Sequence, residues 1–96
     1  MTPEQIKQLT QLPTDQCLIT QALWHDAHGD WKAAHSCAQE DHTHMGSWMH
    51  AYLHRKEGDI GNARYWYSQA GRPVFQGGLQ EEWAAIAQAL NETARD

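Results

Sequence analysis

Two segments of this chain carry the same pattern at a constant spacing. Residues 22–34, Ala-Leu-Trp-His-Asp-Ala-His-Gly-Asp-Trp-Lys-Ala-Ala, align with residues 51–63, Ala-Tyr-Leu-His-Arg-Lys-Glu-Gly-Asp-Ile-Gly-Asn-Ala. Five identities (Ala, His, Gly, Asp and Ala) recur at an offset of 29 residues. A tandem copy of this length is typical of a supersecondary unit that stacks on itself to bury a shared apolar face. The repeat therefore predicts a repeat architecture.

Caps and apolar spacing divide each copy into two helices. In the first unit, about residues 14–41, one helix ends at Gly29 and Asp30 caps the next. In the second unit, about residues 47–71, Ser47 caps the first helix and Gly58 ends it. Each unit is thus expected to be a helical hairpin.

Further helices flank the two units. Thr2-Pro3-Glu4-Gln5 predicts a capped helix that ends near Leu12. A last helix at about 79–93 carries its apolar residues at helical spacing, and we expect it to close an open end of the repeat. No strand pattern of comparable strength occurs. We therefore expect one all-α domain, residues 1–96, of tandem hairpins with flanking N- and C-terminal helices.

The second unit resembles a known family. Gly58-Asp-Ile60-x-x-Ala63-x-x-x-Tyr67-x-x-Ala70 is similar to the second half of a tetratricopeptide repeat. The period is 29 rather than about 34, and there are two units where three are usual. The resemblance implies a small protein-interaction module whose first helices line a concave surface that binds a protein or peptide. The segment 50–73 also resembles a group of short microbial proteins, which implies no function.

Charge and hydropathy exclude several classes of partner. Twelve carboxylates against seven Lys plus Arg give a formal charge of −5, which would repel a nucleic-acid backbone. No apolar run approaches the roughly 18 residues of a membrane span, and the N-terminus lacks a signal-peptide pattern. Cys17 and Cys37 have no zinc-knuckle or disulfide spacing. We expect a cytoplasmic protein that binds neither nucleic acid nor membrane.

A row of polar side chains follows the first helix of each unit, opposite its apolar stripe. The residues of this histidine row are Gln21, His25, His28, His50, His54 and Glu57. If the first helices stack as in tetratricopeptide repeats, the row lies on the concave surface, and it would be the partner-binding face. Trp24 and Trp66 fall off the main apolar stripes, so each is either covered by a neighbouring helix or exposed as an interface anchor.

The same row has two other interpretations. Histidines at i and i+4 can chelate one ion, and a carboxylate would complete a set suited to Zn, Ni or Fe, with His25, His28, His50, His54 and Glu57 as candidate ligands. Alternatively, the row is simply a solvated helix face, and the protein has no cofactor.

No catalytic motif accompanies the row. The serines lack a nucleophile-elbow context, the glycines form no phosphate loop, and neither cysteine lies in an evidently electropositive setting. Glu81 and Glu82 are expected to be a solvated pair at a helix start. We therefore expect a protein that is not an enzyme, unless metal-assisted chemistry occurs at the histidine row.

Overall fold

The structure is a computed structural model that describes residues 1–93, and these residues form helices and no strand. The helices are α1 (Pro3–Gln8), α2 (Leu18–Ala27), α3 (Trp31–Glu40), α4 (His44–Lys56), α5 (Ile60–Ala70) and α6 (Leu79–Thr93). In this part of the chain, no helix has the length and hydropathy to cross a membrane. The all-α prediction is confirmed, and α6 has the predicted bounds.

The two copies of the repeat have the same local structure at their turns. Gly29 and Gly58 adopt φ values of 81° and 90°, which favour glycine and end α2 and α4. Asp30 and Asp59 then cap α3 and α5, each accepting a hydrogen bond from the backbone N–H three residues further on. The sequence identities at the 29-residue offset therefore encode one turn twice.

Two predicted helix boundaries were wrong. Helix α4 begins at His44, capped by the side chain of Thr43, rather than after Ser47. Asp41 fixes this cap, because its Oδ1 accepts hydrogen bonds from the N–H of Thr43 at 2.8 Å and from its hydroxyl at 2.5 Å. Helix α1 ends at Gln8, four residues before the predicted end.

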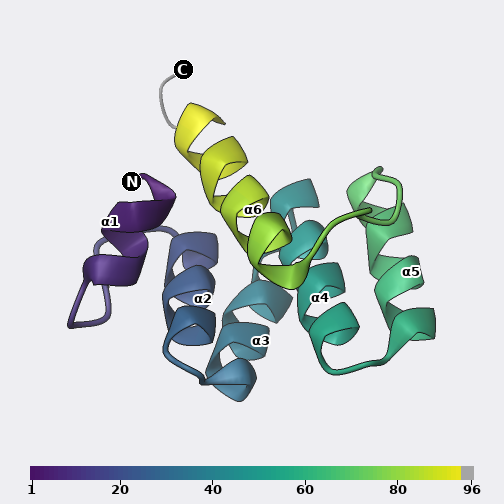
Figure 1. Ribbon diagram of the computed structural model, residues 1–96, viewed down its shortest axis with the longest axis horizontal. Helices are drawn as coiled ribbons and strands as arrows, with labels where there is room; N and C mark the ends of the chain where they lie inside the picture. Colours follow the sequence, from purple (N-terminus) through teal and green to yellow (C-terminus); the bar gives the residue numbers. More distant parts are fainter. Residues whose placement is uncertain (94–96) are drawn as a thin grey trace.

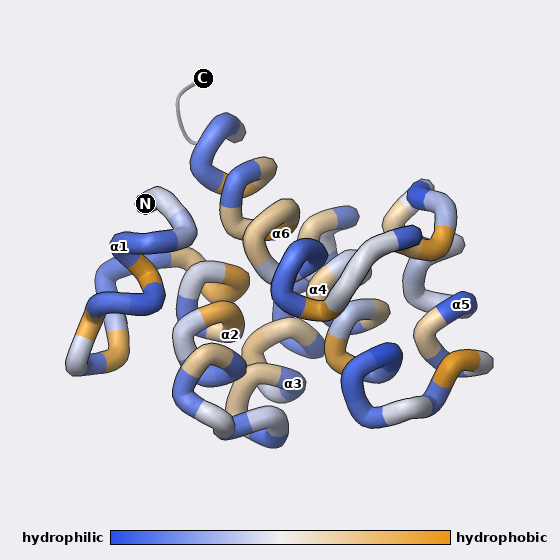
Figure 2. The backbone as a smooth tube through the Cα atoms, in the orientation of Figure 1, coloured by the Kyte–Doolittle hydropathy of each residue, from blue (hydrophilic) through white to orange (hydrophobic). Residues whose placement is uncertain are grey.

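Helices α1 to α5 follow one another across the molecule in chain order (Figure 1). Helix α6 runs back towards α1 and packs on α2 and α4. Helix α2 packs on α3 and α4 packs on α5, while α3 joins the two pairs by packing on α4. Helix α6 contacts α1, α2 and α4. The short α1 is mostly hydrophilic in Figure 2, and Ile6, which is 1% exposed, anchors it to the core.

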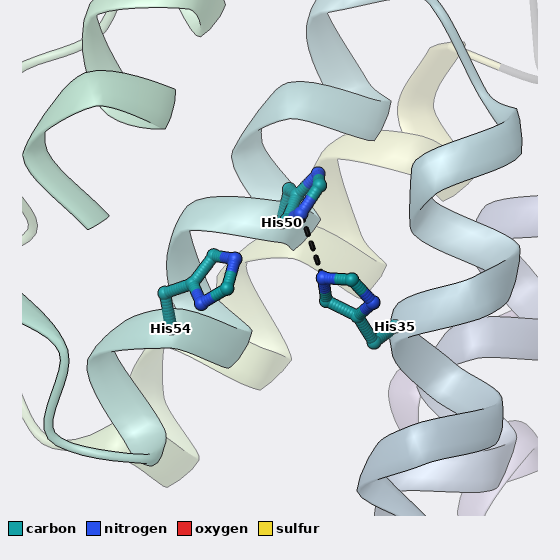
Figure 3. Close-up of side chains that lie close together, drawn as sticks. All are labelled: His35, His50 and His54. Carbon is teal, nitrogen blue, oxygen red and sulfur yellow. Dashed lines mark hydrogen bonds between the residues drawn. The ribbon is translucent and has the colours of Figure 1, made fainter. Parts of the chain in front are cut away.

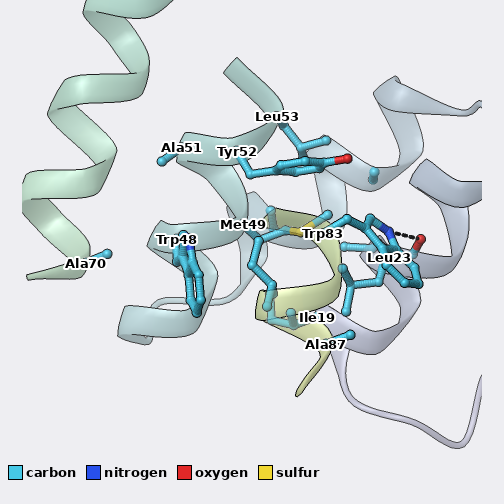
Figure 4. Packing of buried hydrophobic residues seen from close by; sticks show 14 of the residues in the cluster. Ile19, Leu23, Trp48, Met49, Ala51, Tyr52, Leu53, Ala70, Trp83 and Ala87 are labelled. Atoms are coloured by element: carbon cyan, nitrogen blue, oxygen red, sulfur yellow. Dashed lines mark hydrogen bonds between the residues drawn. The ribbon is translucent and has the colours of Figure 1, made fainter. Parts of the chain in front are cut away.

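The apolar core lies between α6 and the α2 and α4 helices. Trp83 of α6 is buried there, and its indole N–H donates to the carbonyl of Leu23 at 3.1 Å (Figure 4). Tyr52 and Met49 of α4 and Ile19 of α2 pack in the same cluster. Helix α6 thus covers the apolar side of α2 and α4, opposite the side on which an open concave surface was expected.

A buried carboxylate links α6 to α4 and α5. Glu82 is 0% exposed and accepts hydrogen bonds from the Trp48 indole at 3.0 Å and the Tyr67 hydroxyl at 2.5 Å. The Arg55 guanidinium pairs with its other oxygen at 2.7 Å. The prediction of a solvated Glu81–Glu82 pair was therefore wrong for Glu82, because the helix start points one carboxylate inward and leaves only Glu81 exposed.

Candidate metal centre

Three histidines meet between α3 and α4. His35 extends from α3, and His50 and His54 extend from α4 towards it (Figure 3). The Nε2 atoms of His35 and His50 are 2.9 Å apart, and one nitrogen from each of the three rings lies within 4.8 Å of the others. We call these three residues the histidine cluster.

The packing of α3 on α4 brings the cluster together. His50 and His54 are one turn apart and share a face of α4. Trp31, at the start of α3, donates its indole N–H to the carbonyl of Leu53 at 2.8 Å, which fixes α3 against α4. His35 lies one turn after Trp31 and therefore faces the same part of α4.

Two tryptophans flank the cluster. The Trp31 ring stacks on His35 with centroids 4.9 Å apart and planes 15° apart. The Trp66 ring of α5 stacks on His50 at 4.0 Å and 12°. His50 and His54 are only 5% and 7% exposed. The imidazoles are therefore held in a largely apolar and aromatic setting.

A carboxylate orients the third imidazole. Glu57 Oε2 lies 2.6 Å from Nδ1 of His54, three residues earlier in the chain. A neutral ring that donates from Nδ1 to this carboxylate would present its lone pair at Nε2. Metal-ligating histidines usually make a carboxylate contact of this kind through the nitrogen that does not bind the metal.

Burial keeps two of the imidazoles neutral. Burial lowers the pKa of His50 to about 4, and the neighbouring His35 and His54 act in the same direction. Burial and His54 also lower the pKa of His35, against a smaller opposing effect of Glu57. Both rings are therefore unprotonated near neutral pH, and the neutral imidazole is the form that binds metal.

The geometry is close to that of a tetrahedral three-imidazole site. At Zn–N distances of about 2.0–2.1 Å, two ligand nitrogens of a tetrahedral site are roughly 3.3 Å apart. The 2.9 Å separation of His35 and His50 would open by a few tenths of an ångström, and His54 would move closer. These shifts are within the range of side-chain rotation.

The structure divides the predicted histidine row. His50, His54 and Glu57 lie together, but His25 and His28 are not part of the cluster. Instead, His28 stacks on Trp24 with centroids 4.0 Å apart, and the His25 ring meets the same indole edge-on at 5.4 Å.

The expected open concave face was also wrong for the central residues of the row. His50 and His54 are buried towards α3 and α5, because the Trp48 side of α4 faces α6. Gln21 is half-buried and donates to the carbonyl of Gln16 at 2.8 Å. His28 borders a separate cavity of about 520 Å³ between α1, α2, α4 and α6.

Of the two alternatives predicted for Trp24 and Trp66, each residue takes the first and is partly covered by a neighbouring segment. Trp24 is half-buried and donates its indole N–H to the carbonyl of Leu9 at 3.0 Å, so it anchors the segment after α1. Trp66 is half-buried against His50. Trp48 and Trp83 are buried, whereas Trp31 is only partly covered, because it flanks the cluster.

His35 is the ligand candidate that sequence reasoning missed. It has no counterpart in the repeat, since the offset of 29 aligns it with Arg64. A usable signal lies in the connection between α3 and α4. His35 and His50 lie seven and eight residues from its centre at His42, and Trp31 and His54 lie eleven and twelve residues from it. Two helices that fold back on each other bring such positions together.

Comparison with protein-family models, curated proteins and solved structures found no match. The tetratricopeptide resemblance therefore stays a prediction.

Proposed function

We propose that this protein binds one divalent transition-metal ion, with Zn²⁺ as the first candidate, through His35, His50 and His54. The observation that carries the proposal is the convergence of three imidazole nitrogens, all within 4.8 Å of one another, in the interior of the helix packing. Imidazole ligands suit Zn, Ni and Fe alike, and Zn is the first candidate because it prefers a four-coordinate tetrahedral site with nitrogen ligands.

Three features support metal binding over a purely structural role. The cluster joins two helices that pack on each other, so an ion would crosslink α3 to α4. Burial lowers the pKa of two rings, which removes competition from protons. Glu57 contacts Nδ1 of His54, which leaves Nε2 as the nitrogen available to an ion. Each of these is a common feature of histidine metal sites.

The test is a Zn²⁺ titration of untagged, metal-free protein, followed by calorimetry and by competition with a chromophoric chelator. We expect a 1:1 stoichiometry in the parent protein. The His35→Gln, His50→Gln and His54→Gln variants should each lose affinity by more than the roughly 10–100-fold that follows from loss of a residue hydrogen-bonded to a ligand.

His25→Gln and His28→Gln are the matched controls, because they remove imidazoles of the predicted row that lie outside the cluster. Both variants should bind Zn²⁺ as tightly as the parent. Absence of 1:1 uptake by the folded parent, or equal losses in the control and cluster variants, would refute the proposal.

Protein binding is a second proposal, which follows from the tetratricopeptide resemblance. It is favoured by α5, which packs on α4 and meets α6 through the Tyr67–Glu82 hydrogen bond, while its opposite face is exposed. Tyr65 on this helix is 56% exposed and meets the ring of Trp66 edge-on. A photo-crosslinking residue at position 65 should capture a discrete partner in source cells, and one at Gln88 on α6 should not. Identical crosslinks from both positions would contradict the proposal.

A further inference from the structure

We infer that an ion held by the histidine cluster keeps one coordination position open, and that this position takes a small exogenous ligand, either water or a coordinating anion. This inference rests on the proposed metal-binding function. It adds the class of the site, since closed four-ligand sites are structural and three-ligand sites bind a further molecule.

The histidine cluster supplies three protein ligands. Within residues 1–93, only His35, His50 and His54 bring donor atoms to a common point in the interior. The other candidate grouping, His54 with Glu57 and Asp59, lies on the Nδ1 side of His54 and is largely exposed. The interior group thus supplies three ligands where a tetrahedral ion needs four.

Glu57, the nearest carboxylate, does not supply the fourth ligand. It contacts Nδ1 of His54, whereas the ion would bind Nε2, on the far side of the same ring. Adding the ring and an ordinary Zn–N distance to the 2.6 Å contact places Glu57 about 6 Å from the ion. Glu57 therefore orients His54 and cannot also fill the fourth position while it does so.

The neighbouring side chains limit the direction from which a ligand can reach the open position and the size of that ligand. His50 and His54 are buried, so the solvent side of the cluster is at the half-exposed His35. Trp31 and Trp66 stand on either side, each stacked on one of the ligand rings. The two rings restrict the approach to small ligands.

The charge of the ion favours an anion at the open position. Three neutral imidazoles leave the full charge of a divalent ion in a setting of low polarity, where an opposite charge is strongly favoured. The carboxylate of Glu57, which contacts His54 rather than the ion, offsets part of this charge. A small anion such as azide or thiocyanate is therefore a suitable probe for the open position.

The experiment uses Co²⁺ in place of Zn²⁺, because the visible absorption of Co²⁺ reports its coordination. Azide is titrated into the 1:1 Co²⁺ complex of the full chain. We expect a saturable change in the visible bands that fits one azide per ion. The same change should occur in His28→Gln, which removes a histidine outside the cluster.

Two outcomes would overturn the inference while leaving metal binding intact. Co²⁺ could bind at 1:1 with bands that azide does not alter, which would mean a closed site. Alternatively, the parent could ignore azide while Glu57→Gln responds to it, which would mean that Glu57 occupies the fourth position. Failure to bind Co²⁺ at all would instead refute the proposed function, so the two failures are distinguishable.

Discussion

Acidification should destabilise the metal-free protein through His50. The pKa of His50 is about 4 in the folded chain, mainly because the ring is buried, and its ordinary value is 6.5. Between these values the unfolded chain binds a proton that the folded chain does not. The free energy of unfolding therefore falls as the pH falls through this window.

The size of the effect follows from the two pKa values. A difference of about 2.5 units corresponds to roughly 3 kcal/mol in full, most of which is lost by pH 4.5. The side chain of His50 is 5% exposed, so solvent screens this effect little. The lowered pKa of His35 acts in the same direction. Against a typical domain stability of about 5–15 kcal/mol, this is a large loss.

Urea unfolding in the presence of a chelator, followed by tryptophan fluorescence between pH 7 and 4.5, measures this loss. His50→Gln should be less stable at pH 7 but should lose about 2–3 kcal/mol less than the parent on acidification. His42→Gln, which changes an exposed histidine, should follow the parent.

If acidification lowered the free energy of unfolding equally in the parent and in His50→Gln, the reasoning would be refuted, because the titration of His50 would then not contribute. A second readout covers the case in which the variant does not fold. The NMR titration of the His50 ring in the metal-free parent should give a pKa near 4. A value near 6.5 would contradict the account directly.

Three further predictions concern other parts of the structure. Glu57→Gln should weaken Zn²⁺ binding roughly 10–100-fold in calorimetry, because His54 loses its orienting partner; an unchanged affinity would exclude this role. Arg55→Ala should lower the free energy of unfolding in urea by about 3–5 kcal/mol, since it leaves the Glu82 carboxylate buried without its cation. Adding Glu82→Gln should recover part of that loss, and no recovery would contradict this explanation. Gly46→Ala should lower the melting temperature, because the added Cβ would collide with the backbone carbonyl of Asp41, whereas Gly61→Ala on open helix surface should stabilise by about 0.5–1 kcal/mol. The reverse order of the two melting temperatures would contradict the packing at α4.

The helices were predictable because their signals are local. Gly29 and Gly58 with the following aspartates encode the same turn twice, and the apolar spacing of residues 79–93 encodes α6. The start of α4 was missed because Thr43 and Asp41 form a better cap than Ser47, and nothing in the apolar spacing distinguishes them.

The site was only half predictable, since it depends on which face of α4 meets which neighbour. The 3.6-residue period places His50 and His54 together, but it does not specify that α6 covers the opposite, Trp48 side. The prediction of a shared surface with His25 and His28 failed for this reason. His35 comes from another helix, so the period of α4 carries no information about it.

Glu82 shows the same limit in the core. Two carboxylates at a helix start satisfy the helix dipole whether they are exposed or buried. Only the positions of Trp48, Tyr67 and Arg55 make a buried carboxylate favourable, and these residues are distant in sequence. Contacts between helices, rather than properties of one helix, decide the outcome.

Metal content tests the central claim most directly. Protein made without an affinity tag, and purified without a chelator, should contain close to one transition-metal ion per chain by elemental analysis, and His50→Gln prepared in the same way should contain almost none. A folded parent protein without metal, or a variant that retains as much metal as the parent, would contradict the assignment of His35, His50 and His54 as a metal site.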